Sequence, residues 1–197
     1  MRRLLLTSLI LLALPAAAIA HGRSNPADAL AHLPIEASVY DRATHCSAKK
    51  RRGVVKLQRW LEANVRGVFW SSYRCEMWGK REASLHAENR AIDWHLDARS
   101  AADRRVAAGL IGLLLATDSA GNAQALARRM GVEELIWDCG YWAAGMAELQ
   151  AYRPCFGRRG KPRKRVDTTV AHRDHIHIGM TKAGAAGRTS FWRGHTG

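Results

Sequence analysis

The sequence predicts an α+β domain, in which helices are interleaved with short strands. Three observations support this class. Apolar residues between positions 53 and 65 recur at helical spacing, which indicates an amphipathic helix. Residues 68–73 form a short β-rich run. Residues 175–180 alternate histidines with apolar side chains at the spacing of a strand.

The individual elements follow in chain order. Gly67 comes shortly after the first helix, where a helix C-cap glycine belongs. Ser100 and Asp103 resemble a capping box with aspartate in place of glutamate, and they open a long helix that continues to about Thr117. The other expected elements are a helix over residues 122–130 and strands over residues 68–73, 91–94, 132–138 and 175–180.

The first twenty residues are typical of a secretory signal peptide. A basic start at residues 1–3 precedes a short apolar run over residues 4–14, and residues 18–20 fit the small-x-small cleavage pattern. The alternative is an uncleaved membrane anchor, but the apolar run is too short for a stable span. We therefore expect a mature chain that begins near His21 and is secreted into the periplasm, the cell wall or the extracellular space.

The mature chain is long enough for one domain with a substantial core. Residues 21–45 carry little periodicity and are expected to form a lead-in segment, so the compact domain is expected over residues 46–197. Residues 157–165 (GRRGKPRKR) combine glycine, proline and charge without apolar partners, which indicates a solvated loop. No segment after the signal approaches the length of a membrane span.

The chain is strongly basic, with a formal net charge of +14. In an exported protein this charge favours an anionic cell-wall polymer or a membrane surface as partner over nucleic acid, which the protein would meet only after export. The alternative is that the charge serves solubility alone. The expected oligomeric state is a monomer.

The four cysteines all follow the signal peptide, and an even count in an oxidising compartment favours two disulfides. Three pairings are possible in principle. The preferred one joins Cys46 to Cys75 and Cys139 to Cys155, because each bridge then ties a segment to its nearer neighbour. The alternative, a zinc site of four thiolates, lacks the C-x2-C spacing on which zinc fingers depend.

Two stretches carry candidate metal ligands. His86 and Asp93 lie seven positions apart, with an expected turn between them that can bring both to one ion. His175 and His177 lie on one face of the last expected strand, because side chains two apart in a strand point the same way. A catalytic zinc site uses three protein ligands and keeps one open position. The sequence therefore predicts zinc bound by His86, Asp93 and His177, with Asp174 and His175 left for proton transfer. The alternative for His175 and His177 is a surface strand that carries histidines by chance. The alternative for His86 and Asp93 is an exposed histidine and an unrelated buried aspartate.

These stretches resemble the zinc D-Ala-D-Ala carboxypeptidases and the VanY-like peptidases. The shared patterns are S-x-H-x6-D from Ser84, D-H-x-H from Asp174 and, upstream, S-x-Y-R from Ser71. That group shares its fold with the metal-binding domain of hedgehog proteins and with murein endopeptidases. Exported extensin-like domains bear the same set of residues. The resemblance covers residues 71–177 and implies a small antiparallel sheet with flanking helices.

The resemblance also implies a role for each matching residue. His86, Asp93 and His177 match the three zinc ligands, and Asp174 matches the acidic general base. Arg74 matches an arginine that holds the polarised carbonyl oxygen. His175 matches an assisting histidine, which leaves two candidates for the base.

One position departs from the pattern of this group. Asn89 stands where the group usually has glycine, three residues after the first ligand. Asparagine is the residue that best replaces glycine at a positive φ, so the turn is expected to be retained.

The expected function is a secreted zinc metallopeptidase that hydrolyses an amide bond in peptidoglycan peptides through a metal-bound water, as a carboxypeptidase or an endopeptidase. One alternative is a non-catalytic, zinc-containing cell-wall-binding module, for which the acid at Asp174 would have no use. A second is a basic, disulfide-linked binding domain without metal.

Other conspicuous residues are expected to have structural roles. Glu133 and Glu134 are interpreted as ordinary surface acids, and His172 as an exposed polar histidine. Trp94 is expected in the core and His95 on the surface.

Overall fold

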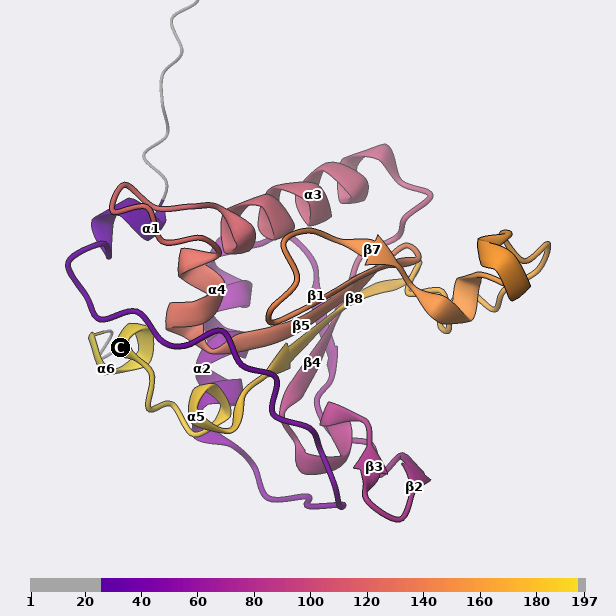
Figure 1. Cartoon of the computed structure of the whole chain (residues 1–197), viewed down its shortest axis with the longest axis horizontal. Helices are drawn as coiled ribbons and strands as arrows, with labels where there is room; N and C mark the ends of the chain where they lie inside the picture. Colours follow the sequence, from indigo (N-terminus) through magenta and orange to yellow (C-terminus); the bar gives the residue numbers. More distant parts are fainter. Residues whose placement is uncertain (1–25, 195–197) are drawn as a thin grey trace, which may run out of the picture.

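The computed structural model describes residues 26–194, so the expected signal peptide over residues 1–20 lies outside the described residues. The chain is a mixed α+β structure, as predicted (Figure 1). Its helices are α1 Pro26–Ala29, α2 Arg52–Asn64, α3 Ala101–Leu115, α4 Ala125–Met130, α5 Lys182–Ala185 and α6 Ser190–Gly194. Its short 3-10 helices are η1 Leu85–Glu88, η2 Arg153–Cys155 and η3 Arg158–Gly160.

A six-stranded sheet organises the fold, and every neighbouring pair in it is antiparallel. The spatial order of its strands is β1 Val68–Ser71, β4 Ala91–His95, β8 His175–Met180, β5 Val132–Trp137, β6 Gly140–Ala143 and β7 Gln150–Ala151. The last strand of the chain, β8, thus lies in the middle of the sheet. A separate hairpin is formed by β2 Met77–Gly79 and β3 Glu82–Ala83.

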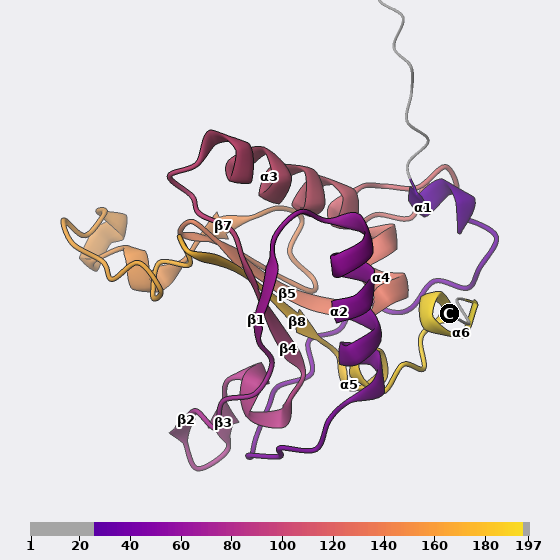
Figure 2. The ribbon, with the colours of Figure 1, turned by 180° about the vertical axis from the view of Figure 1, so that it is seen from behind.

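The two faces of the sheet have different environments because side chains alternate along each strand. Ile92 and Trp94 of β4, Ile176 and Ile178 of β8, and Leu135 of β5 are buried in the main hydrophobic core. Helix α2 covers this face, behind the sheet in Figure 1 and in front of it in Figure 2. The expected inward orientation of Ile176, Ile178 and Trp94 is therefore confirmed, and the intervening polar residues face the opposite side of the sheet.

Gly67 has a role other than the expected C-cap. Helix α2 ends at Asn64, and its C-cap is Val65 in an extended conformation. Gly67 has a φ of 142°, and a Cβ at this position would lie 2.1 Å from Nε1 of Trp94. A glycine is needed here because the chain passes directly over the indole ring, whose Nε1 donates to the carbonyl of Arg66 at 3.2 Å.

Half of the expected capping box is present at the start of α3. The hydroxyl of Ser100 accepts a hydrogen bond from the backbone N–H of Asp103 at 3.3 Å. The carboxylate of Asp103 accepts from the backbone N–H of Asp97 rather than from that of Ser100. The helix begins where predicted and ends at Leu115.

The folded structure begins earlier than the expected start near Cys46. Ala43 is buried and forms a β-bridge with Ala83 of the hairpin. The hydroxyl of Tyr40 donates to Glu134 at 2.8 Å, and the backbone N–H of Asp41 donates to Glu133. In Figure 1 this indigo segment runs from α1 toward β2 and β3. Residues 35–45, called the strap below, were not revealed by periodicity because they pack in an extended form and not as a helix or a named strand.

Both preferred disulfides are present. Cys46 pairs with Cys75 at a Cα–Cα distance of 5.3 Å, and Cys139 pairs with Cys155 at 5.7 Å. Within residues 26–194, no helix is long and apolar enough to cross a lipid bilayer.

Candidate metal centre

Strand pairing brings two of the predicted ligands together. Asp93 of β4 lies directly opposite His177 of β8, so both side chains project from the same face of the sheet. His86 belongs to η1, just before β4. Asn89 ends η1 in the left-handed conformation, with φ 54° and ψ 45°, and this turns the chain from η1 into β4. The expected tolerance of asparagine for a positive φ at this position is confirmed.

The three predicted ligands converge on one point. Nε2 of His86 lies 2.9 Å from Oδ1 of Asp93 and 3.0 Å from Nδ1 of His177, and the last two atoms are 3.4 Å apart. The residues are 1%, 4% and 4% exposed for His86, Asp93 and His177. Ligands bound tetrahedrally to zinc at about 2.0–2.1 Å are separated by roughly 3.3 Å. The observed spacing is close to that geometry.

Polar contacts on the outer side of each ring indicate where its lone pair points. Nδ1 of His86 lies 3.2 Å from the carbonyl oxygen of Ser72, which can only accept, so Nδ1 carries the proton. Nε2 of His177 lies 3.1 Å from Oε1 of Glu134, which places the proton on Nε2. The lone pairs of both inner nitrogens therefore face the carboxylate of Asp93. Three acceptors that meet in a buried space require a cation between them, and a metal ion fits this requirement.

The proton affinities of these residues are consistent with a cation site. Burial lowers the pKa of His86. Burial also opposes the charge on His177, but the hydrogen bonds and negative charges of Asp93 and Glu134 outweigh it and raise its pKa to about 9. The cluster therefore binds a proton strongly when it has no metal, and metal binding must displace that proton.

The S-x-Y-R element contributes two of the groups that orient the ligands. Ser71 of β1 lies opposite Asp93, and its hydroxyl donates to Oδ2 of Asp93 at 2.9 Å. The next residue, Ser72, supplies the carbonyl that orients His86. The two oxygens of Asp93 thus have separate roles, because Oδ2 is held by Ser71 while Oδ1 faces the metal position.

Glu134 is not the surface acid that the sequence predicted. It is 9% exposed, and its carboxylate lies at ion-pair distance behind His177, although the contact is not aligned as a good hydrogen bond. Its Oε2 accepts hydrogen bonds from the hydroxyls of Tyr40 at 2.8 Å and Tyr141 at 3.3 Å. Burial would raise the pKa of Glu134, but its partners, His177 first, lower it. The only signal in the sequence was a pair of adjacent acids, Glu133 and Glu134, within a strand whose other residues are apolar.

Close packing against β8 makes this position of Glu134 possible. Gly179 is the partner of Glu134 in the sheet. A Cβ at Gly179 would lie 3.0 Å from Cβ of Glu134 and 2.3 Å from Cδ1 of Leu85 in η1. The absence of a side chain at Gly179 therefore allows both β5 and η1 to approach the centre.

The prediction for Glu133 was wrong as well. Glu133 is fully buried and accepts a hydrogen bond from Nη1 of Arg90 at 2.7 Å. Burial raises its pKa to about 7, against the effect of the backbone N–H of Asp41 and the charge of Arg90. Arg90 also donates to Glu88 at 2.9 Å, so this buried network joins the strap, η1 and β5.

His175 lies between Asp174 and the predicted ligands. Its Nδ1 is 2.7 Å from Oδ1 of Asp174, and its Nε2 is 3.5 Å from Oδ1 of Asp93. The second oxygen of Asp174 accepts from the hydroxyl of Thr169 at 2.6 Å. The exposed ring of Trp70 packs edge-on against His175, with centroids 5.5 Å apart. His175 is thus held by a carboxylate on one side and directs its other nitrogen toward the metal position.

His172 is half-buried beside the centre, whereas the sequence predicted an exposed side chain. Its ring lies 4.6 Å from that of His175 and 5.9 Å from that of His177. Burial, with the neighbouring histidines, lowers its pKa to about 3, so the ring is neutral. The backbone of His172 has a φ of 52°, and this turn folds the ring back over the strand. No spacing rule in the sequence indicates such a turn.

Arg74 and His95 lie at the rim of the site. The Arg74 side chain is 54% exposed, pairs with Glu76 at 3.1 Å and approaches Oδ2 of Asp93 at 3.9 Å. His95 is exposed, as predicted, and packs against Trp70.

Comparisons with protein-family models, with curated proteins and with solved structures found no match for this chain.

Proposed function

We propose that this protein is a secreted zinc metallopeptidase that hydrolyses an amide bond in peptidoglycan peptides. The observation that carries the proposal is the convergence of three buried acceptors, His86 Nε2, Asp93 Oδ1 and His177 Nδ1, next to a histidine held by a carboxylate. Two nitrogen ligands and one carboxylate oxygen form a donor set of the kind used at catalytic zinc sites.

The residues around the ligands suit amide hydrolysis. A zinc ion in this position would supply Lewis acidity, which acidifies water and polarises a carbonyl group. His175 takes the proton of the attacking water on Nε2, because its Nδ1–H is directed to Asp174. Asp174 stabilises the imidazolium that forms. His175 then returns the proton to the leaving amine.

Of the two candidates for the base, the geometry favours His175 over Asp174. Both oxygens of Asp174 already accept short hydrogen bonds, one from His175 and one from Thr169. Asp174 therefore acts through the ring that it orients.

Arg74 is suited to stabilise the negative charge that develops on the carbonyl oxygen, because its guanidinium lies beside Asp93 at the rim of the site. It must leave its ion pair with Glu76 to do so, and this pair is exposed and therefore weak.

The choice of substrate rests on the likeness of the sequence patterns to cell-wall peptidases and on the charge of the chain. A net charge of +14 favours residence near an anionic wall. Two disulfides are compatible with an oxidising compartment outside the cytoplasm.

The test uses residues 21–197, stripped of metal with a chelator and then supplied with one equivalent of zinc. Both forms are incubated with purified peptidoglycan, and released fragments are identified by mass spectrometry. We expect zinc-dependent release that is lost in His175→Ala and strongly reduced in Asp174→Ala. His32→Ala, which removes an exposed histidine outside the site, serves as the matched control.

The other outcomes are equally informative. Tight zinc binding without release would contradict a peptidase acting on this polymer and would support a non-catalytic, zinc-containing cell-wall-binding module. A failure to bind zinc would contradict the metal centre itself. The masses of the fragments would distinguish a carboxypeptidase from an endopeptidase.

A further inference from the structure

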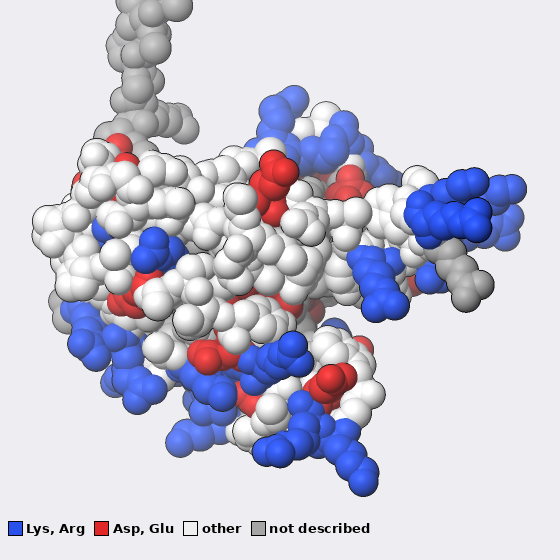
Figure 3. Space-filling view, viewed as in Figure 1, with Lys and Arg blue, Asp and Glu red and all other residues white. Residues whose placement is uncertain are grey.

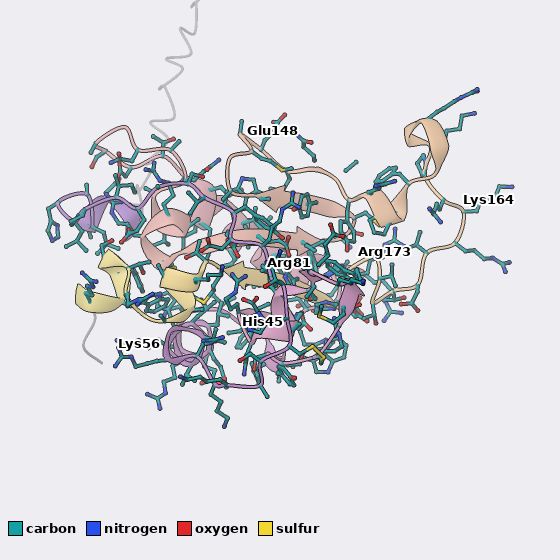
Figure 4. All side chains as sticks on the ribbon, turned by 60° about the horizontal axis from the view of Figure 1, so that its bottom comes forward. His45, Lys56, Arg81, Glu148, Lys164 and Arg173 are labelled. Carbon is teal, nitrogen blue, oxygen red and sulfur yellow. A yellow bond between two sulfur atoms is a disulfide. The ribbon has the colours of Figure 1, made fainter. Side chains whose placement is uncertain are left out.

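A basic arm, residues 152–166, projects from the body of the protein. It contains seven lysine and arginine residues and no aspartate or glutamate: Arg153, Arg158, Arg159, Lys161, Arg163, Lys164 and Arg165. Figures 1 and 2 show the arm, in orange, extending past the end of the sheet. In Figure 3 basic side chains gather at its tip, and Figure 4 shows Lys164 pointing away from the body.

The arm has a defined backbone structure. The Cys139–Cys155 disulfide joins its base to the turn between β5 and β6. Cys155 accepts a backbone hydrogen bond from Arg163 at 3.0 Å, and Gly157 donates one to Lys161 at 2.7 Å. Phe156 and Pro162 form a β-bridge between the same two legs. These contacts tie the outgoing leg (residues 155–157) to the returning leg (residues 161–163), so the charged side chains are carried by a loop with a defined backbone conformation.

Five cations of the arm lack protein partners among the described residues, whereas Arg163 donates to the carbonyl of Phe156 at 3.1 Å. Arg153, Arg159, Lys161, Lys164 and Arg165 are all exposed. Within residues 26–194, none of these five side chains forms an ion pair or a hydrogen bond. Some exposed arginines elsewhere on the surface do form ion pairs, for example Arg99 with Asp97 and Arg173 with Asp138. Like charges held close together repel one another, and a polyanion relieves this repulsion while it releases its own counterions.

We propose that the arm is a binding site for a linear acidic polymer of uronate or polyol-phosphate units, whose carboxylate or phosphate groups pair with these cations. Single-stranded nucleic acid fits less well, because such sites interleave basic residues with exposed aromatic rings, whereas both aromatic residues of the arm, Tyr152 and Phe156, are half-buried. A bilayer fits less well too, because Pro162 is the only exposed apolar residue of the arm, while Phe156 and Val166 are half-buried.

The arm leads directly to the metal centre. Its returning leg continues through residues 167–173 into Asp174 and His175, and Thr169 on the way bonds to Asp174. A polymer bound to the arm is therefore held at the end of the sheet where β8 begins. Binding by the arm does not depend on the metal, so this inference stands apart from the proposed peptidase activity.

The experiment measures binding of residues 21–197 to two fluorescently labelled polymers, a polyuronate and a poly(glycerol phosphate), by anisotropy over a range of NaCl concentrations with EDTA present. The test variant is Lys161→Gln/Lys164→Gln/Arg165→Gln. The control, Lys49→Gln/Lys50→Gln/Arg59→Gln, removes the same charge from exposed residues near α2. Labelled neutral dextran reports binding that does not depend on charge.

We expect the arm variant to bind at least one acidic polymer about tenfold or more weakly than the parent. Its binding should also depend less steeply on salt, because fewer contacts form and fewer counterions are released on binding. The control variant should lose less than about threefold. Which of the two polymers binds more tightly identifies the acidic group. Equal losses in both variants would overturn the proposal, because binding would then follow net charge alone. Tighter binding to duplex DNA or to anionic lipid vesicles than to either of these two polymers would overturn the choice of partner.

Discussion

Replacing Glu134 with glutamine tests whether the carboxylate behind His177 strengthens the metal centre. The substitution keeps the size of the side chain, and an amide oxygen can still accept from the hydroxyls of Tyr40 and Tyr141. It removes the negative charge 3.1 Å from Nε2 of His177. That charge keeps the proton on Nε2 and makes Nδ1 a better ligand.

The size of the effect follows from the position of Glu134. Loss of an outer carboxylate partner of a histidine ligand typically weakens metal binding about 10- to 100-fold, or roughly 1.4–2.7 kcal/mol. Glu134 and His177 are both buried, so solvent does not screen the interaction. We therefore expect Glu134→Gln to weaken zinc binding by about this amount.

Zinc affinity is measured by competition with a chromophoric chelator at fixed pH, and far-UV circular dichroism checks the fold. Glu148→Gln, which removes the same charge from an exposed side chain, is the control. A zinc affinity within twofold of the parent in a folded Glu134→Gln protein would refute this account of the centre.

Three further predictions follow from the packing and the charges. Gly179→Ala should lower the free energy of unfolding by about 1–3 kcal/mol, because the new Cβ would overlap the side chain of Leu85 at 2.3 Å. The control Gly109→Ala should not lower it, because a Cβ at Gly109 would lie in open space. Chemical denaturation compares the two variants. His175→Ala should abolish hydrolysis while zinc binding changes less than fivefold, and a large loss of zinc would instead make His175 a ligand. Asp118 is paired with Arg129 at 2.8 Å. Burial alone would raise the pKa of Asp118, but hydrogen bonds from Asn122 and Arg129 have the larger effect, and the pKa is lowered to about 2. Its stabilising effect is therefore present above about pH 4 and lost as the pH falls through 2, so Asp118→Asn should flatten the pH dependence of unfolding in that range, and an unchanged slope would contradict the assignment.

The sequence indicated which residues would form the candidate metal centre, although their convergence depends on how two strands pair. The two-residue spacing of His175 and His177 fixes a common face in a strand, and β4 and β8 then pair with Asp93 opposite His177. Asn89 indicated the turn that returns His86 to the same point, because few residues adopt a positive φ. The disulfides followed from the count of cysteines and their distance along the chain.

The residues that support the ligands were not predictable in the same way. Tyr40, Tyr141 and Glu134 come from three separate parts of the chain, and no spacing in the sequence connects them. Glu134 and Glu133 look like exposed acids until β5 is placed between β8 and β6, where both are buried. His172 reaches the centre through a turn that has no sequence signature.

The sequence by itself indicated the α+β class, the preferred disulfide pairing and the three candidate ligands, because periodicity, cysteine spacing and residue chemistry can be read along the chain. Only the tertiary structure decided that residues 35–45 form a strap, that Tyr40 of this strap bonds to Glu134, and that Glu134 stands behind His177. The physical reason is that these contacts join residues distant in sequence, and only the order and register of the strands bring them together.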